Sequence, residues 1–398
     1  MERRRVRSLL SISASHGIMH SYLVFLSALL PLMKEELGNY EVIGLLISIV
    51  YLVYGWGSLP IGILADRYSK KQLVISSMIL CGLSSFIVGV SEGLIPIGIS
   101  LFLLGIGTSL YHPAGFSLVS LISERMRGRF MGVHGLGGNI GMAVAFISSA
   151  IFGQLFGWRK AFILWGSVGI AMGILDAFII TEPKAKRDTN EIEPPQSNIN
   201  YYKTLKSHFF NKQKLRSFSL VFIVVVFSGA LWNGVSSFII AYLKEVKGID
   251  LIIAGGLATI SYVVGSLATM IGGELSDKFG RRIILLIGFS TFAIALLLFT
   301  LPLGYNKIIT LMVISLLGFT FYLTQSPLNA LLGDVTPADV RGLAYGINFM
   351  IKYGIGGFSP LIAGYLAENF SMDYIFYFFA VLSTLAFLIS LRLSNKNE

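Results

Sequence analysis

Four histidines lie in long apolar stretches of the sequence, where an ionisable side chain is costly unless it has a function. His16 and His20 are four residues apart and therefore share one face of a helix, while His112 and His134 lie in two later stretches. Imidazole exchanges protons near neutral pH, so these side chains could carry protons. They could instead bind a transition-metal ion, or donate a hydrogen bond to a neighbouring backbone, a role that suits His134 equally well.

Lys352 lies near the middle of a further apolar stretch, residues 342–367. A lysine at that depth must face a wet cavity, pair with an acid or lose its proton. Asp176, the one acid in a comparable stretch, lies close to the end of residues 161–181, so a pair between the two is not expected. We expect Lys352 to face a cavity and attract anions; a side chain that reaches the membrane surface is the second alternative.

Polar and aromatic side chains occupy corresponding depths in the second half of the chain. Amides in such positions can simply join helices. Gln325 and Asn329 are four apart and flank Pro327, which should free a backbone carbonyl and bend the helix, so we expect a role for both in a polar pathway. Trp232 lies far from either end of its stretch, which favours a ligand-stacking or gating surface, and Asn233 follows it.

The elements that carry these residues are predicted to be transmembrane helices. Of the 398 residues, 54% are hydrophobic and only 13% are charged, and the mean hydropathy is +0.74. These values exclude a water-soluble enzyme. Stretches of about 20 apolar residues are needed to cross a bilayer as a helix. Twelve stretches meet or nearly meet that length, two of them with one charge each: 8–33, 42–65, 72–91, 93–123, 130–158, 161–181, 217–243, 251–273, 283–306, 308–333, 342–367 and 374–391.

The positive charges lie mostly on one side of the predicted helices. The net charge of +10 could suggest nucleic acid or acidic lipid as a partner, but in a membrane protein the distribution matters more. The termini and the even-numbered connections hold 24 Lys and Arg, against six in the odd-numbered connections. By the positive-inside rule, both termini face the cytoplasm of a multi-pass protein of the cell membrane.

The chain divides into two related halves of six helices. Residues 182–216 contain prolines, Asn, Ser and eight basic residues, which is typical of a linker, and a surface helix near 201–210 is possible within it. We therefore predict a bundle at 1–181, a cytoplasmic linker at 182–216 and a second bundle at 217–398. The segment GILADRYSKK at 62–71 reappears as GELSDKFGRR at 273–282, which indicates a duplicated unit of the kind that builds secondary transporters.

These two segments resemble the loop signature of the major facilitator superfamily, and the twelve helices and central loop extend the resemblance over the whole chain. Within it, HGIMHSY at 16–22 and YHPA at 111–114 resemble the fosmidomycin-resistance-like branch, whose members export drugs and small molecules. This chain has His20 and Ala114 where that branch commonly has acids, and Ser69 where the signature usually has glycine. The resemblance implies an all-α fold of two pseudo-symmetric bundles and places His16, His20 and His112 on a central cavity.

The resemblance also implies that the repeated segments form a gating latch. Their aspartates would accept hydrogen bonds at a helix end and pair with an arginine across the gap between the bundles in one of two rocked states. The alternative is that these residues are ordinary positive-inside anchors. The latch residues implied by the resemblance are Asp66, Arg67, Asp277 and Lys278, with Arg127 and Arg341 as possible partners.

These features predict a secondary active transporter that works by alternating access and exports a small polar or anionic solute in exchange for protons. Organic-anion uptake, transport of a transition-metal ion and a transport-inactive membrane sensor on the same fold are the alternatives. The sequence contains no nucleotide-binding loop or convincing nucleophile, so we expect no enzyme activity, no cofactor and no nucleic-acid partner. A single cysteine, Cys81, excludes an intrachain disulfide. We expect a monomer in contact with lipid and with its small-molecule substrate.

Overall fold

A computed structural model of the chain describes all residues except 1, 123–125, 183–211, 303–305, 337–340 and 394–398. Every element in the described part of the chain is a helix, and eleven of these helices are long and apolar enough to cross a membrane. The expected helical membrane fold is thereby confirmed. The linker predicted at 182–216 and its possible surface helix lie almost wholly outside the described residues.

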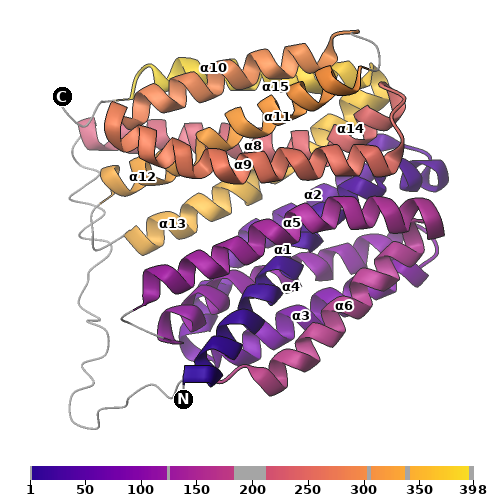
Figure 1. The fold of residues 1–398 in the computed structure, drawn as a ribbon, viewed down its shortest axis with the longest axis vertical. Coiled ribbons are helices and arrows are strands. Elements are labelled where there is room, and N and C mark those ends of the chain that lie inside the picture. The colour runs from indigo at the N-terminus through magenta and orange to yellow at the C-terminus, as the bar shows by residue number, and fades with distance from the viewer. Residues whose placement is uncertain (1, 123–125, 183–211, 303–305, 337–340, 394–398) are drawn as a thin grey trace.

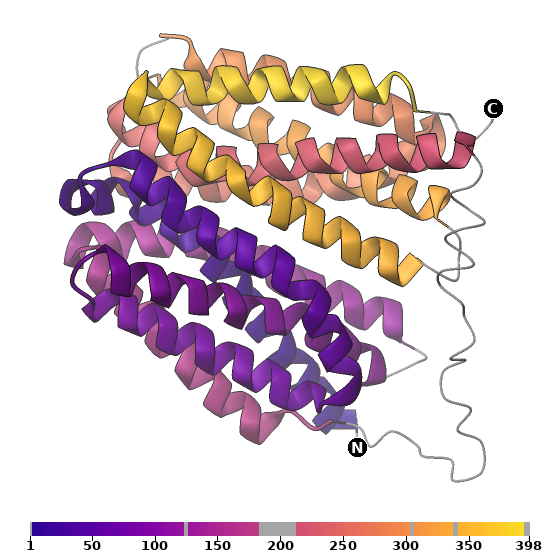
Figure 2. The same ribbon diagram turned by 180° about the vertical axis from the view of Figure 1, so that it is seen from behind.

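The two halves form two bundles that lie side by side (Figures 1 and 2). The first bundle consists of α1 (Glu2–Leu37), α2 (Tyr40–Arg67), α3 (Lys70–Val90), α4 (Leu94–Ile122), α5 (Arg127–Phe156) and α6 (Trp158–Ile179). The second consists of α8 (Lys212–Glu245), α9 (Leu251–Phe279), α10 (Arg281–Thr300), α11 (Lys307–Leu323), α12 (Gln325–Val335), α13 (Arg341–Phe349), η2 (Met350–Ile355), η3 (Gly356–Phe358), α14 (Ser359–Asn369) and α15 (Met372–Ser390).

Short connections with specific end residues set the helix boundaries. Asn39 caps α2 by accepting hydrogen bonds from the backbone N–H groups of Glu41 and Val42, and Asp250 caps α9 in the same way at Ile252 and Ile253. Gly157 adopts a φ of 87° between α5 and α6, a conformation that other residues rarely adopt. These tight turns keep consecutive helices antiparallel and adjacent.

Two of the predicted membrane spans are interrupted. The span 308–333 breaks at Thr324, so that α11 and α12 are separate helices. The span 342–367 is divided into α13, a π-helical turn (η2), a 3-10 turn (η3) and α14, and it is missing from the eleven membrane-crossing helices, among which α11 and α12 count together as one. Broken helices in membranes commonly line a cavity or a binding site, because only there can freed backbone groups find partners.

In part of the contact between the two bundles, backbone lies directly against backbone. α2 packs on η2, η3 and α14, while α5 packs on α9. A Cβ atom on Gly44 would lie 2.4 Å from the carbonyl oxygen of Pro360, and one on Gly55 would lie 2.2 Å from the nitrogen of Gly354. Only glycine allows helices to approach so closely.

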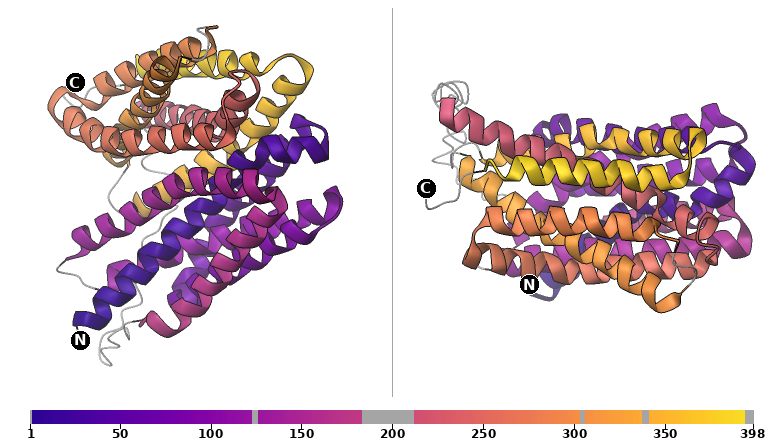
Figure 3. Two further views of the ribbon diagram at one scale, coloured as in Figure 1. Left: turned by 45° about the vertical axis from the view of Figure 1, so that its right-hand side comes forward. Right: turned by 90° about the horizontal axis from the view of Figure 1, so that it is seen from above.

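The ends of the two bundles differ in how closely they approach. The bundles diverge toward the end where N and C lie and converge at the opposite end, which we call the distal end (Figures 1 and 3). Polar contacts join the bundles there. They include Lys34–Glu245 at 3.7 Å, Lys244–Glu35 at 3.5 Å, Gln154 Nε2 to Asp250 Oδ2 at 2.8 Å, and Tyr40 N to Glu368 Oε2 at 2.9 Å.

Candidate functional site

The structure brings the four intramembrane histidines into one cluster inside the first bundle. His16 and His20 project from α1, His112 from α4 and His134 from α5. The ring centroid of His16 lies 4.6 Å from that of His20, 5.1 Å from that of His112 and 4.0 Å from that of His134, on which it stacks. His16, His112 and His134 are buried, so a proton gained by the cluster would be shielded from water.

Within the histidine cluster, His16 is the residue that binds backbone. Its Nδ1 lies 2.7 Å from the carbonyl oxygen of His134 and can only donate to that acceptor. The other nitrogen, Nε2, is buried and has no hydrogen-bond partner among the described residues, and the same is true of Nδ1 of His112 and both ring nitrogens of His134. The backbone-binding role suggested for His134 therefore belongs to His16. Unpartnered buried nitrogens of this kind are costly unless they bind a water or a ligand.

Three of these histidines are also arranged as a metal site would require. One ligand nitrogen from each of His16, His20 and His112 lies within 4.8 Å of the others. In a tetrahedral zinc site each nitrogen lies about 2.0–2.1 Å from the metal, so small rotations would have to draw the rings closer. Three imidazoles without a carboxylate can suffice for such a site, with a water as fourth ligand. The donor set thus fits a transition ion as cargo or ligand.

Lys352 lies in the second bundle, on the π-helical turn η2. Its Nζ donates a hydrogen bond of 2.6 Å to Oε1 of Gln325, whose Nε2 lies 3.2 Å from Ser228 Oγ. Asn233 Nδ2 donates to the backbone oxygen of Lys352 at 3.1 Å and so anchors the turn to α8. Among the described residues, no carboxylate lies within ion-pair distance of the Lys352 ammonium.

Gln325 and Asn329 do not act as a pair. The helix is interrupted at Thr324, one residue before Gln325 and close to Pro327, where the sequence predicts a bend. Gln325 is buried against α8, whereas the side chain of Asn329 is exposed. The structure therefore brings Gln325, but not Asn329, into contact with Lys352.

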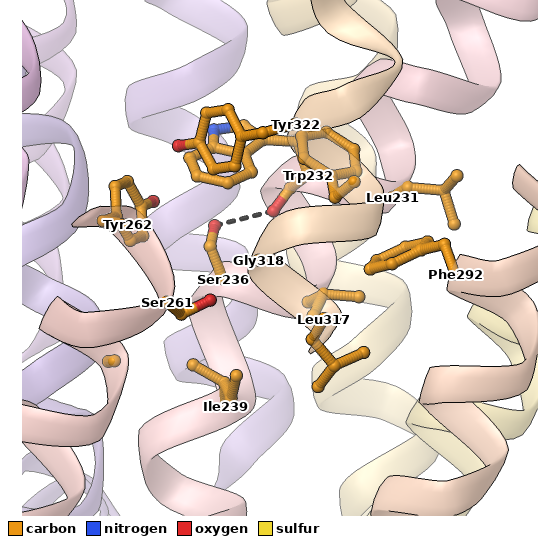
Figure 4. Close-up of a pocket in the computed structure, with 13 residues that line it drawn as sticks. Leu231, Trp232, Ser236, Ile239, Ser261, Tyr262, Phe292, Leu317, Gly318 and Tyr322 are labelled. Carbon is orange, nitrogen blue, oxygen red and sulfur yellow. Dashed lines mark hydrogen bonds between the residues drawn. The ribbon is translucent and has the colours of Figure 1, made fainter. Parts of the chain in front are cut away.

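Trp232 lies in an aromatic cluster of the second bundle (Figure 4). Its ring stacks on Phe321 at 5.1 Å between centroids and lies 4.9 Å from Tyr262 and 5.1 Å from Tyr322. These rings line a cavity in the second bundle between α8, α9 and α11. Trp232 is placed where a ligand could stack on it.

Aromatic side chains that the sequence analysis did not single out lie between the two clusters. Phe349 of α13 contacts His112 with 4.9 Å between ring centroids, and Tyr54 of α2 lies 4.8 Å from Tyr353 and 5.7 Å from His112. Phe349 and Tyr353 are spaced four apart around Lys352, which is the sequence signal that could have found them. They connect the second bundle directly to the histidine cluster.

Asp176 makes contacts that the sequence analysis did not predict. Its side chain is fully buried against α1. Ser11 and Ser15 each donate a hydrogen bond of 2.6 Å to one of its two carboxylate oxygens. Two serines spaced four apart on the facing helix are the signal for this contact. Asp176 does not pair with Lys352, as expected.

The latch residues are described only in the second half of the chain. Asp277 accepts a hydrogen bond from Arg281 Nη1 at 2.8 Å within its own bundle, and Arg281 Nε also donates to Asp334 at 2.6 Å. Lys278 lies over the ring of its neighbour Phe279. The side chains of Asp66, Arg67, Arg127 and Arg341 lie outside the described residues. The latch across the bundles thus stays a prediction.

Two bundles of membrane helices, broken helices at mid-depth and polar clusters in both halves define a transporter of small solutes. Residues 12–360 match the Major Facilitator Superfamily, and the chain belongs to that family. Its relatives include a Staphylococcus aureus protein assigned as a proline/betaine transporter, 22% identical over 348 residues, which are 81% of this chain and 72% of that one. A protein of Cupriavidus necator assigned as a sulfoacetate transporter is 25% identical over 368 residues, 87% of this chain and 83% of the relative.

Solved structures of the same fold include a bacterial homologue of the human lysosomal transporter Spinster in an inward-facing, unoccupied conformation. Its TM-score is 0.84 at 16% identity, with 98% of each chain covered. A D-xylose–proton symporter has a TM-score of 0.79 at 15% identity, with 99% of each chain covered. At these identities the likeness concerns the fold alone, which is the fold predicted from the sequence.

Proposed function

We propose that this chain is a secondary transporter that moves a small organic anion across the cell membrane by alternating access, coupled to protons. The observation that carries the proposal is Lys352, a basic side chain at mid-span that no described carboxylate neutralises. The Gln325 amide holds the ammonium by its carbonyl oxygen and leaves the remaining donors for an anion. The sulfoacetate relative is consistent with an anionic substrate.

The histidine cluster supplies the proposed proton carriers. Its unpartnered ring nitrogens can accept protons, and Phe349 and Tyr54 connect the cluster to the bundle that holds Lys352. A proton on the cluster would alter the balance between two arrangements of the bundles if it binds one of them better. We expect the coupling free energy to be about 1–3 kcal/mol.

We further propose that the termini are cytoplasmic, as the positive-inside rule predicts. The distal end, where the bundles are joined, would then face outward, and the described state would be open toward the cytoplasm. Proton exchange would drive export, which the motifs of the first and fourth helices favour. Proton symport would drive uptake, which is how the D-xylose–proton symporter of the same fold is named.

Flux into proteoliposomes that contain the purified protein tests the anion site. Lys352→Ala should lower the initial rate of organic-anion flux at least tenfold, because a charge-assisted hydrogen bond of about 1.5–3 kcal/mol is lost. Lys160→Ala, which changes an exposed lysine, is the matched control and should transport normally. Unchanged flux in Lys352→Ala would contradict the proposed site.

Imposed pH gradients test the coupling and its direction. In wild-type proteoliposomes the gradient that accelerates flux distinguishes exchange from symport. His112→Ala should make flux insensitive to the gradient while downhill flux of the anion persists. If wild-type flux does not respond to a pH gradient of either sign, protons are not the coupling ion.

A transition-metal ion is a second candidate substrate, favoured by the spacing of His16, His20 and His112. Equilibrium dialysis of the purified protein against Ni²⁺ or Zn²⁺ measures this directly. One bound ion per chain that is lost in His16→Ala would favour the metal as substrate. Binding that is equal in wild type and His16→Ala would reject it.

A further inference from the structure

Two tyrosine–glycine pairs cross where the two bundles meet. Gly55 of α2 lies so close to η2 that a Cβ atom on it would be 2.2 Å from the backbone nitrogen of Gly354. The residues just before these glycines are Tyr54 and Tyr353, and their ring centroids are 4.8 Å apart. Tyr353 directly follows Lys352 in the chain. A shift of the turn that carries the proposed anion site therefore moves a ring that contacts Tyr54.

Tyr54 also contacts the histidine cluster. Its ring centroid lies 5.7 Å from that of His112. Phe349 of the second bundle contacts both rings, at 5.6 Å from Tyr54 and 4.9 Å from His112 between centroids. Tyr54 and His112 belong to the same bundle and stay together when the bundles rock as units, whereas Phe349 and Tyr353 move relative to them.

The polar atoms of Tyr54 and His112 are complementary and unused. Tyr54 is fully buried, and its hydroxyl has no hydrogen-bond partner in the described part of the chain. Nδ1 of His112 is buried and likewise has no partner there. A phenol hydroxyl donates and an imidazole nitrogen without a hydrogen accepts, so the two groups can satisfy each other. Leaving both unsatisfied disfavours the described arrangement relative to one in which they bond.

This unused hydroxyl distinguishes Tyr54 from the other rings around His112. In the described part of the chain, the rings in contact with His112 are those of His16, His20, Tyr54, Tyr111, Phe116 and Phe349. His134 of α5 is a further titratable neighbour, and none of these residues is a carboxylate or an ammonium. Tyr111 already donates its hydroxyl to the backbone oxygen of Ile12. Among these rings, Tyr54 is therefore the phenol whose hydroxyl is available to His112.

We propose that Tyr54 is a positioning residue of the proton pathway, whose hydroxyl binds the His112 imidazole when Phe349 and Tyr353 move away with the second bundle. This inference rests on the proposed function and adds a residue to its coupling step. The hydrogen bond fixes the orientation of the His112 ring in one arrangement of the bundles and not in the other. The histidine cluster is thereby linked to the position of the Lys352 turn.

Tyr54→Phe tests the inference, because it removes the hydroxyl and keeps the ring. The measurement is anion flux into proteoliposomes with and without an imposed pH gradient, expressed for each variant as the ratio of the two rates. We expect the ratio to fall about threefold or more in Tyr54→Phe, as for the loss of one hydrogen bond. Tyr111→Phe is the matched control, since it removes the hydroxyl of another ring beside His112 that is bonded elsewhere, and it should keep the wild-type ratio.

A second pair of variants tests the hydrogen bond without the ring. Glutamine and methionine have side chains of similar length, but only glutamine carries a donor. Tyr54→Gln should therefore retain a larger flux ratio than Tyr54→Met. Thermal unfolding in detergent establishes that each variant is folded. A ratio in Tyr54→Met equal to or above that in Tyr54→Gln would contradict the role of the hydroxyl.

The outcomes separate this inference from the function on which it rests. Wild-type flux that does not respond to a pH gradient would remove proton coupling, and this inference with it. A wild-type response that is retained in Tyr54→Phe would overturn the inference alone and leave the transporter proposal intact. Equal losses in Tyr54→Phe and Tyr111→Phe would assign the effect to the packing of phenols around His112 and would also overturn it.

Discussion

Asp176 and Lys352 show two ways in which a charged side chain is accommodated among apolar helices. The carboxylate of Asp176 is fully buried, and serine hydroxyls donate to both of its oxygens. The ammonium of Lys352 has one amide acceptor and remains partly exposed. The first site is satisfied by the protein itself, whereas the second retains capacity for a ligand. We therefore expect Asp176 to act in stability and Lys352 in transport.

Replacement of Asp176 by alanine tests this distinction. Asp176→Ala should lower the free energy of unfolding by about 1–3 kcal/mol, because two serine hydroxyls lose their acceptor in a buried site. Asp176→Asn keeps an oxygen acceptor and should cost less. The measurement is thermal unfolding in detergent, with proteoliposome flux beside it. A variant of unchanged stability that has lost its response to a pH gradient would instead place Asp176 in the proton pathway.

The sequence reveals residues that are costly to bury in a membrane helix, because they interrupt an apolar stretch. It does not reveal residues whose role depends on a distant contact. The histidines and Lys352 stood out because they interrupt apolar stretches, and the spacing of His16 and His20 already placed them on one face. The contacts of Asp176 were not predicted because its partners, Ser11 and Ser15, lie more than 160 positions away and are ordinary residues in a membrane helix. Contacts of that range follow from helix packing and not from local pattern.

At the scale of elements, the π-helical turn η2 determines where Lys352 lies. A glycine of α8 makes room for it: a Cβ atom on Gly229 would lie 2.3 Å from the carbonyl oxygen of Lys352. Asn233, one turn further along α8, donates to that same oxygen. The turn is thus fitted to α8 by close approach and by a hydrogen bond together.

Gly229→Ala should displace this turn. We expect a loss of about 1–3 kcal/mol in the free energy of unfolding from overpacking, and a loss of anion flux larger than the loss of folded protein. Gly135→Ala is the matched control, because beyond its own neighbours in the helix no described atom would lie within 4 Å of the added carbon. That variant should be as stable as wild type or more stable, since alanine favours helix. Normal flux in a folded Gly229→Ala protein would show that the turn is not critical.

The twelve spans were predictable from length and apolar composition because lipid requires both. The interruptions within them were predictable only in part. Pro327 predicted an irregularity in its helix, which is interrupted nearby at Thr324. Residues 350–355, in contrast, form a π-helical turn and contain no proline. Their geometry follows from the contact with α8, which no single stretch of sequence reveals.

At the scale of the whole molecule, the distal end holds the two bundles together. Its contacts are ion pairs and hydrogen bonds between partly or fully exposed side chains, each of which contributes little. Interactions of this strength can form and break as the bundles rock, and we expect them to be lost in the opposite state.

The link between Gln154 and Asp250 gives this end a pH dependence. The hydrogen bond from Gln154 lowers the pKa of the Asp250 carboxyl below its ordinary value. A lowered pKa contributes stability above the unfolded-state value of about 3.9, and this contribution is lost as the pH falls through the folded-state pKa. Asp250→Asn keeps the helix cap but removes the charge, so it should unfold at a slightly lower temperature than wild type at pH 6.

That difference in unfolding temperature between wild type and Asp250→Asn should shrink as the pH approaches 3. Glu92→Gln, which neutralises an exposed carboxylate in another loop of the same end, is the control for general charge effects. A difference that stays constant from pH 7 to pH 3, or that matches the control, would contradict this account.

The glycine seam between α2 and the broken helix η2–α14 has a mechanical consequence. Interdigitated side chains resist the sliding of one helix along another, because each shift forces them out of the grooves in which they pack. Where Gly44 faces Pro360 and Gly55 faces Gly354, the touching surfaces are nearly smooth. The two helices can therefore stay in contact while one rotates against the other, because few side chains have to be displaced. Bulky residues in place of these glycines would interlock the two surfaces and hinder the rotation of one bundle against the other.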